Sequence, residues 1–301
     1  MTGKSLLSSA RQLTRRHFCR NGTLLLLPLG RLAAQKDLGS SPEPITRIGL
    51  VTDLHHADKA PAGTRHYRET LSKLEEAGQR FREVRTSHVI ELGDLIDAAD
   101  SVELELKYLK TINRLLGSFP GENHYVLGNH CVDTLTKNEF LSGVGKTASY
   151  YSFDESGFHI VILDACFRSD GVAYQRRNFE WTDPNLSNEE MHWLEQDLGK
   201  TDLPVVVFVH QRLDVGEPYG IKNASRIRKI LEENGQVRGI FQGHSHKNDH
   251  RVINGIHYVT LVAMVEGSGA ANSGYSLLGL HASGMLSVEG FRRQDGYRMG
   301  Q

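Results

Sequence analysis

Five strand-like apolar runs in this sequence are each followed at once by polar side chains that are chiefly Asp, His and Asn. In chain order the clusters are Asp53-Leu54-His55, Gly93-Asp94, Gly128-Asn129-His130, His210 and Gly243-His244-Ser245-His246. In an open α/β sheet, ligands bind in the loops beyond the carboxyl ends of the strands. A chain with such clusters after five strands is therefore expected to bring distant segments to one point.

Strand-like and helix-like patterns alternate along most of the chain. The run from Leu203 to Val209 is the most continuous β-branched stretch, which favours a central buried strand. From Ile256 to Phe291 the pattern predicts strands without a helix. The other expected strands are 45–52, 87–92, 124–127, 237–241 and a hairpin of 150–153 with 158–163, and the expected helices are 68–82, 102–116, 187–198 (opened by a capping box at Ser187) and 224–233. This order predicts an α/β fold, with two sheets and outer helices in an α/β/β/α sandwich.

Residues 1–34 have the layout of a cleavable export signal. A basic, acid-free stretch contains Arg15-Arg16-His17-Phe18, an apolar run follows from Thr23 to Leu29, and Leu32-Ala33-Ala34 offers small residues for cleavage. The apolar run is shorter than the roughly 20 residues of a membrane span. The pattern resembles a twin-arginine signal, with the general secretory route as the alternative. We therefore expect the twin-arginine export machinery as a partner, and a periplasmic or secreted protein without a membrane span in its mature form.

Composition and the placement of turn-forming residues predict the remaining boundaries. Residues 35–44 favour a linker, 45–293 the folded domain and 294–301 a tail. The leader carries six of the 35 basic residues, so the remainder has 29 basic residues against 36 acidic ones, a net charge of −7. This balance and the lack of a basic stripe exclude long nucleic acid as an expected partner. The pattern-free segment 167–186 is expected either to rim a substrate site or to be a surface excursion.

The residue types in the five clusters are those of a metal site. Side chains at positions i and i+2 of an extended backbone face the same way, so Asp53 with His55, and His244 with His246, can each hold a cation. Carboxylate, imidazole and carboxamide ligands without thiolate suit manganese, iron or zinc. Seven candidate ligands exceed the needs of one ion and fit a pair of ions. The candidates are Asp53, His55, Asp94, Asn129, His210, His244 and His246.

The ordered set Asp-x-His, Gly-Asp, Gly-Asn-His, a lone His and Gly-His-x-His resembles the calcineurin-like metallophosphoesterases, over about Ile45 to Phe291. The resemblance implies one metal ion held by Asp53, His55 and His246, a second held by Asn129, His210 and His244, and Asp94 between them. It also implies His130 as the acid that protonates the leaving oxygen or as a contact to the phosphoryl group. A hydroxide bridging the two ions would attack phosphorus.

Within the family, the sequence is similar to the manganese-dependent ADP-ribose/CDP-alcohol diphosphatases. Supporting stretches are 64–68, 150–153 and 257–259, although their tyrosines also suit a hydrophobic core. The resemblance implies manganese as the expected metal and a small nucleotide-like phosphorylated substrate cleaved at a phosphodiester or diphosphate bond. A periplasmic phosphomonoesterase and a non-catalytic metal-binding protein are the alternatives.

One position departs from the family pattern. Cys131 follows His130 where family members often have an acid that positions the histidine, and the nearest acid is Asp133. Either Asp133 or another carboxylate therefore orients His130. Cys131 and Cys166 are expected to be unpaired thiols, although the sequence does not exclude a disulfide between them.

Overall fold

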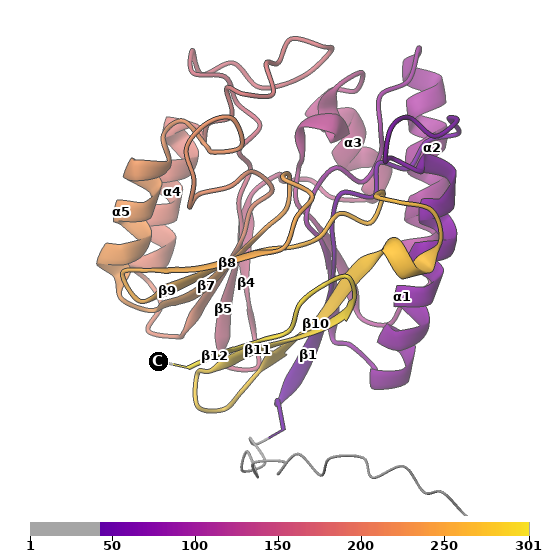
Figure 1. The fold of residues 1–301 in the computed structure, drawn as a ribbon. Helices are drawn as coiled ribbons and strands as arrows, with labels where there is room; N and C mark the ends of the chain where they lie inside the picture. Colours follow the sequence, from indigo (N-terminus) through magenta and orange to yellow (C-terminus); the bar gives the residue numbers. More distant parts are fainter. Residues whose placement is uncertain (1–42, 301) are drawn as a thin grey trace, which may run out of the picture. The chain divides into compact units, whose positions relative to one another are not determined.

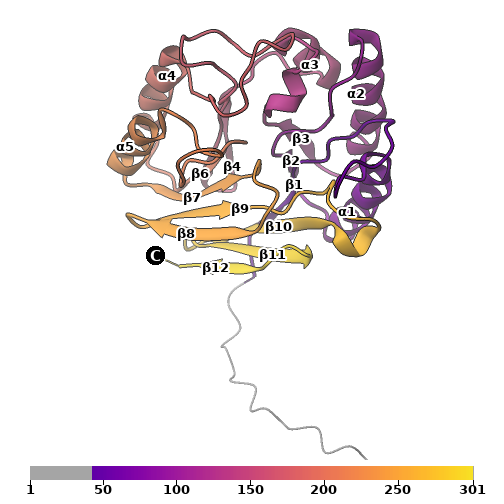
Figure 2. The ribbon, with the colours of Figure 1, turned by 45° about the horizontal axis from the view of Figure 1, so that its top comes forward.

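The computed structural model describes residues 43–300, which form two six-stranded sheets with helices outside them (Figure 1). The predicted leader, residues 1–34, and most of the linker lie outside the described residues. The α/β/β/α arrangement predicted from the sequence is confirmed: α1, α2 and α3 lie on one side of the paired sheets, and α4 and α5 on the other (Figure 2).

The first sheet has the order β12-β11-β10-β1-β2-β3. Its central strands β1, β2 and β3 are parallel, and β10, β11 and β12 extend it in antiparallel fashion. The strands are β1 (Thr46–Val51), β2 (His88–Glu91), β3 (Glu122–Tyr125), β10 (Gly274–Leu280), β11 (Leu286–Arg292) and β12 (Tyr297–Met299).

The second sheet has the order β4-β5-β6-β7-β9-β8, in which β5, β6, β7 and β9 are parallel and the edge strands are antiparallel. The predicted central position of the run 203–209 is confirmed, because β6 lies between β5 and β7. The strands are β4 (Tyr151–Glu155), β5 (Phe158–Ile162), β6 (Val205–Phe208), β7 (Val237–Gln242), β8 (Asp249–Ile253) and β9 (Ile256–Thr260).

The central parallel strands bury both faces, which explains why strands such as β5 and β6 read as continuous apolar runs. In β6, Val206 and Phe208 face the other sheet, whereas Val205 and Val207 face the helices. The helices are α1 (Thr70–Val84), α2 (Val102–Leu116), α3 (Lys137–Val144), α4 (Asn188–Leu198) and α5 (Ala224–Asn234), with 3₁₀ turns η1 (Tyr67–Glu69), η2 (Asn129–Val132) and η3 (Ala270–Asn272). No helix among residues 43–300 has the length and apolar character needed to cross a membrane.

Three elements escaped the sequence analysis: α3, β8 and β12. Helix α3 opens with a capping box of Thr136 and Glu139, and β12 forms within the segment 294–301 that was expected to be a tail. The capping box expected at Ser187 is only half formed. Ser187 accepts a hydrogen bond from the Glu190 amide, but the Glu190 carboxylate turns inward to the Asp164 amide at 2.7 Å. Cys131 and Cys166 are buried and unpaired, as expected.

A buried histidine joins the edges of the two sheets. His124 on β3 stacks on Phe153 of β4 at 4.2 Å, and its ring nitrogens lie 3.0 Å from His88 Nδ1 and from the Tyr151 hydroxyl. Burial, reinforced by the neighbouring Lys146 and His88, lowers the pKa of His124 from 6.5 to about 3. The folded protein therefore holds this imidazole neutral over a pH range in which the unfolded chain protonates it.

This shift predicts acid sensitivity of the fold. Below about pH 6.5 His124 becomes protonated in the unfolded chain but stays neutral in the folded protein. The free energy of unfolding therefore falls as the pH is lowered towards 3, and this group contributes at most about 1.4 kcal/mol per pH unit. His124→Gln should flatten the fall. Urea unfolding of chelator-treated protein between pH 7 and pH 4 measures it, with His192→Gln, at an exposed histidine, as the control. An unchanged slope in the His124 variant would contradict this assignment.

Candidate metal centre

The five polar clusters meet at the carboxyl ends of the parallel strands. Hydrogen bonds from the Asp53 amide to the Gly93 carbonyl (2.9 Å) and from the His55 amide to the Asp94 carbonyl (2.7 Å) tie the loops after β1 and β2 together. Among residues 43–300, eleven non-glycine residues have positive φ, and five of them are predicted ligands: Asp53, His55, Asp94, His244 and His246. Such backbone strain, roughly 1–3 kcal/mol per residue, is typical of functional sites.

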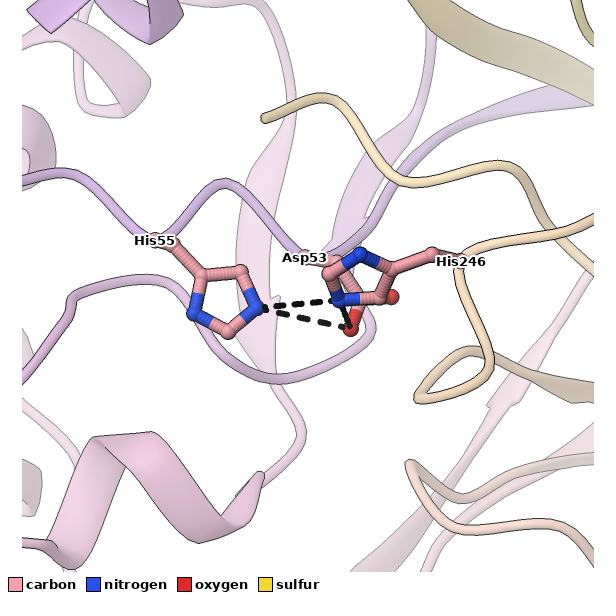
Figure 3. A group of neighbouring side chains, drawn as sticks. All are labelled: Asp53, His55 and His246. Atoms are coloured by element: carbon pink, nitrogen blue, oxygen red, sulfur yellow. Dashed lines mark hydrogen bonds and ion pairs between the residues drawn. The ribbon is translucent and has the colours of Figure 1, made fainter. Parts of the chain in front are cut away.

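The first group consists of Asp53, His55 and His246 (Figure 3). The Nε2 atoms of His55 and His246 lie 3.2 Å apart, and the Asp53 Oδ1 atom lies 3.8 Å from the first and 3.4 Å from the second. Two ring nitrogens and one carboxylate oxygen therefore point at a common centre. This is the first of the two ligand groups expected from the sequence.

The second group consists of Asp94, His210 and His244. His210 Nδ1 lies 2.8 Å from the Leu92 carbonyl oxygen, to which it can only donate, so Nε2 carries the lone pair of the neutral ring. That Nε2 atom lies 3.1 Å from Asp94 Oδ2. The same Asp94 oxygen is 3.6 Å from His55 Nε2. Asp94 thus lies between one nitrogen from each group, as expected of a bridging carboxylate.

The residues present fit bound cations. Five buried atoms of the predicted ligands have no hydrogen-bond partner within residues 43–300: His55 Nδ1, Asp53 Oδ1, Asn129 Oδ1, His210 Nε2 and His244 Nε2. A buried polar group without a partner destabilises a fold by roughly 1–3 kcal/mol. Bound cations would satisfy four of them, all except His55 Nδ1, because the His55 ring faces the other ligands through Nε2. The mixed nitrogen and oxygen donors suit manganese, iron or zinc.

The electrostatics divide the four histidines into two pairs. Burial lowers the pKa of His55 to about 4 and that of His244 to about 3, so both rings are neutral near pH 7. Burial also opposes protonation of His210 and His246, but the neighbouring carboxylates outweigh it and raise the pKa of each to about 9: chiefly Asp94 for His210 and Asp53 for His246. These two rings carry the charge that balances the buried acids when no cation does.

Further side chains hold the ligands in place. Asp53 Oδ2 accepts hydrogen bonds from the Thr52 hydroxyl (2.7 Å) and the His244 amide (3.1 Å). His246 Nδ1 lies 2.6 Å from a carboxylate oxygen of Glu266, which fixes the ring so that Nε2 faces the centre. A carboxylate behind a histidine in this way commonly orients a metal ligand. Sequence spacing gave no sign of this contact, because twenty residues separate the partners.

His130 has an orienting partner that the sequence analysis left unassigned. Its Nδ1 atom lies 3.0 Å from Oδ1 of Asp97, a buried residue in the loop after β2. Asp133, the nearest acid in sequence, faces Arg177 at 3.7 Å instead. Burial disfavours the charged Asp97, but His130 holds the pKa of this carboxyl well below its usual range. In the sequence, the sign of this partner was an acidic residue, Asp97, three positions after the predicted ligand Asp94.

A pocket of about 270 Å³ opens over the ligands. Trp181 comes from the segment 167–186, so this segment rims the site, which was one of the two expectations from the sequence. Tyr219 follows β6 and stands beside Trp181. The lining residues are Arg65, Asp94, Asn129, His130, Trp181, Tyr219, His244 and His246.

Glycines let the loops approach closely enough to form the site. A Cβ at Gly128 would lie 2.2 Å from Asp94 Oδ1, and one at Gly93, where φ is +101°, would lie 2.5 Å from the His210 ring. Such separations are impossible without displacing the ligand. Glycine is therefore needed beside these predicted ligands, because one ligand packs closely against the next loop.

Comparison with known proteins gives matches to phosphoesterases and phosphatases. The family model described as calcineurin-like phosphoesterase matches residues 46–248. A manganese-dependent ADP-ribose/CDP-alcohol diphosphatase of Arabidopsis thaliana is 22% identical over 273 residues, covering 74% of this chain and 88% of that protein. A dimetal phosphatase from Danio rerio has a TM-score of 0.75 at 19% identity, covering 85% of this chain and 99% of that one. A purple acid phosphatase from Lupinus luteus has a TM-score of 0.54 at 15% identity, covering 84% and 52%. The two structures show the shared fold.

The close approach at Gly128 predicts a specific loss. In Gly128→Ala the added methyl group displaces Asp94, so we expect Mn²⁺ affinity, measured by calorimetry on metal-stripped protein, to fall by about 10–100-fold. Gly216→Ala is the control, because a Cβ there meets nothing within 4 Å. Equal affinities in the two variants would contradict the described role of the Gly128 turn.

Proposed function

This chain belongs to the calcineurin-like phosphoesterase family, and from that premise we propose that it hydrolyses phosphodiester or diphosphate bonds of small nucleotide-like substrates with two bound divalent metal ions. The position of Asp94 carries the proposal. Its Oδ2 atom lies 3.6 Å from His55 and 3.1 Å from His210, which belong to separate ligand groups. A single ion does not need a carboxylate placed between two such groups.

The proposed ligand sets are those expected from the sequence. Asp53, His55 and His246 would hold one ion, Asn129, His210 and His244 the other, and Asp94 both. Manganese is the proposed metal, because the matched Arabidopsis protein is named as manganese-dependent; iron and zinc also suit these donors. When bound, such a pair of ions activates water and neutralises charge on a phosphoryl group.

The chain's own residues then position the substrate and move a proton. Asp97 occupies Nδ1 of His130, which leaves Nε2 to face the pocket. Near Asp94 and Asp97 the pKa of His130 is raised although burial opposes protonation, so the ring holds a proton that it can give to the leaving oxygen as the phosphorus–oxygen bond breaks. Arg65 lines the same pocket and supplies positive charge for a phosphoryl oxygen.

The proposal is tested by hydrolysis with metal-stripped protein and added Mn²⁺. The substrates are ADP-ribose, a CDP-alcohol, bis-p-nitrophenyl phosphate, p-nitrophenyl phosphate and cyclic AMP. We expect manganese-dependent turnover of the diesters and diphosphates that Asp94→Ala abolishes. Preference for p-nitrophenyl phosphate would identify a phosphomonoesterase instead, and metal binding without turnover of any substrate would favour a binding protein.

The same assay separates the two candidate partners of His130. Asp97→Asn removes the negative charge that orients the His130 ring and favours its protonated form, so kcat should fall by about 100-fold or more. Asp133→Asn is the matched control and should leave kcat within about twofold, because Asp133 does not contact His130 in the described structure. The reverse ranking of the two variants would show that Asp133 orients the acid.

We propose, from the sequence pattern of residues 1–34, that the protein is exported by the twin-arginine route. Replacing Arg15 and Arg16 together by lysine should abolish its appearance in the periplasmic fraction, as measured by immunoblotting of the full-length chain. The same exported amount with and without the twin arginines would contradict this route.

A further inference from the structure

Two exposed aromatic rings stand at the mouth of the metal centre. Trp181 is 41% exposed and Tyr219 39%, whereas most large apolar side chains among residues 43–300 are buried. Their rings lie 5.9 Å apart, and each lies 5.9 Å from the ring of His244. Both line the pocket over the ligands, while the other exposed large apolar residues do not. Exposed ring faces beside a catalytic centre are a binding feature, since burial would otherwise stabilise them.

The loop carrying Trp181 is fixed to the body of the domain. Fully buried Tyr174 donates a hydrogen bond to the Glu180 carbonyl at 3.0 Å, directly before Trp181. Arg177 donates to the Ala99 carbonyl at 2.7 Å, and Arg176 to the Thr134 carbonyl at the same distance. The Trp181 ring is thus presented by an anchored backbone, which lowers the entropy lost when a ligand binds.

Tyr219 is held by backbone hydrogen bonds to Arg212, in a segment separate from the loop that carries Trp181. Its carbonyl accepts a hydrogen bond from the Arg212 amide at 3.2 Å, and the Arg212 carbonyl accepts one from Ile221 at 2.9 Å. Arg212 is itself buried and bonded to Asp214. Two separately anchored segments therefore place their aromatic rings together over His244.

The pocket also contains a positively charged side chain. Arg65 is partly buried, hydrogen-bonds with the Tyr67 hydroxyl, and its charge favours the ionised form of Glu266. Its positive charge disfavours protonation of both His130 and His246, so it lies close to the proposed acid and the first ligand group. The pocket thus combines ligand atoms, a guanidinium group and two aromatic rings in about 270 Å³, just below the usual range of ligand-site volumes.

We propose that Trp181 and Tyr219 form a stacking subsite for a nucleobase, joined through its sugar to the phosphoryl group that Arg65 and the metal centre hold. This assignment rests on the proposed phosphoesterase function and names the substrate portion that the pocket selects. A flat heteroaromatic ring gains more binding free energy from contact with exposed aromatic rings than an aliphatic group does. Base stacking also tolerates different bases. The subsite therefore selects nucleotides as a class.

Binding without turnover gives the first test. The chain has two tryptophans, so Trp193→Phe leaves Trp181 as the sole tryptophan reporter. With Mn²⁺ present, α,β-methylene-ADP should quench its fluorescence and bind on the order of tenfold more tightly than ribose 5-methylenediphosphonate, which lacks the base. Equal affinities measured by calorimetry, with no quenching specific to the base, would overturn the subsite.

Turnover gives the second test. Trp181→Ala should lower kcat/KM on the order of tenfold for ADP-ribose, but leave the base-free diphosphate of two ribose units unchanged, and Trp181→Phe should restore most of the loss. Val172→Ala, at an exposed residue of the same segment outside the pocket, is the matched control. An equal loss on both substrates would overturn the subsite and leave the hydrolase intact. Base-dependent quenching without any hydrolysis would instead retain the subsite and refute the proposed function.

Discussion

The site depends on the burial of two carboxylates among four imidazoles. Asp53 and Asp94 are almost fully inaccessible to solvent, a position that charged groups occupy only with compensating charge. The histidines provide it in the described structure, where His210 and His246 are the rings whose pKa the acids raise. The same arrangement leaves oxygen and nitrogen lone pairs without hydrogen-bond partners, and these are the atoms through which a cation would bind. Charge burial and metal affinity are thus two consequences of one geometry.

The fold supplies the stability that this geometry uses. Three apolar cores, one between the sheets and one beneath each helical layer, hold the parallel strands rigidly. The strained backbone at Asp53, Asp94 and His244 lies at the ends of those strands, and the buried residues Leu54 and Leu95 continue the apolar core directly beyond Asp53 and Asp94. The rigid strands aim the ligands, while the flanking glycines admit neighbouring loops. The two outer loops that present Trp181 and Tyr219 line the pocket over these ligands, and there we propose that the base of the substrate binds.

The sequence predicted what local pattern determines. The α/β/β/α fold and the family are confirmed, because buried parallel strands have a recognisable composition and the motif order is specific. The structure gathers all seven predicted ligands, whose roles stay a prediction until metal is bound. The pairing of His130 with Asp97 was missed because it depends on how the loop after β2 curves. The meeting of Trp181 with Tyr219 was invisible for a similar reason: two loops distant in sequence create it. Helix α3 and strand β8 were missed because short, partly exposed elements carry weak periodicity.

The central claim is that Asp94 joins two metal ions in one centre. Electron paramagnetic resonance of metal-stripped protein titrated with Mn²⁺ tests this most directly. We expect two Mn²⁺ per chain with the spectrum of an exchange-coupled pair, replaced in Asp94→Ala by the signals of isolated ions. A single equivalent of Mn²⁺ with an isolated-ion spectrum in the unaltered protein would contradict it.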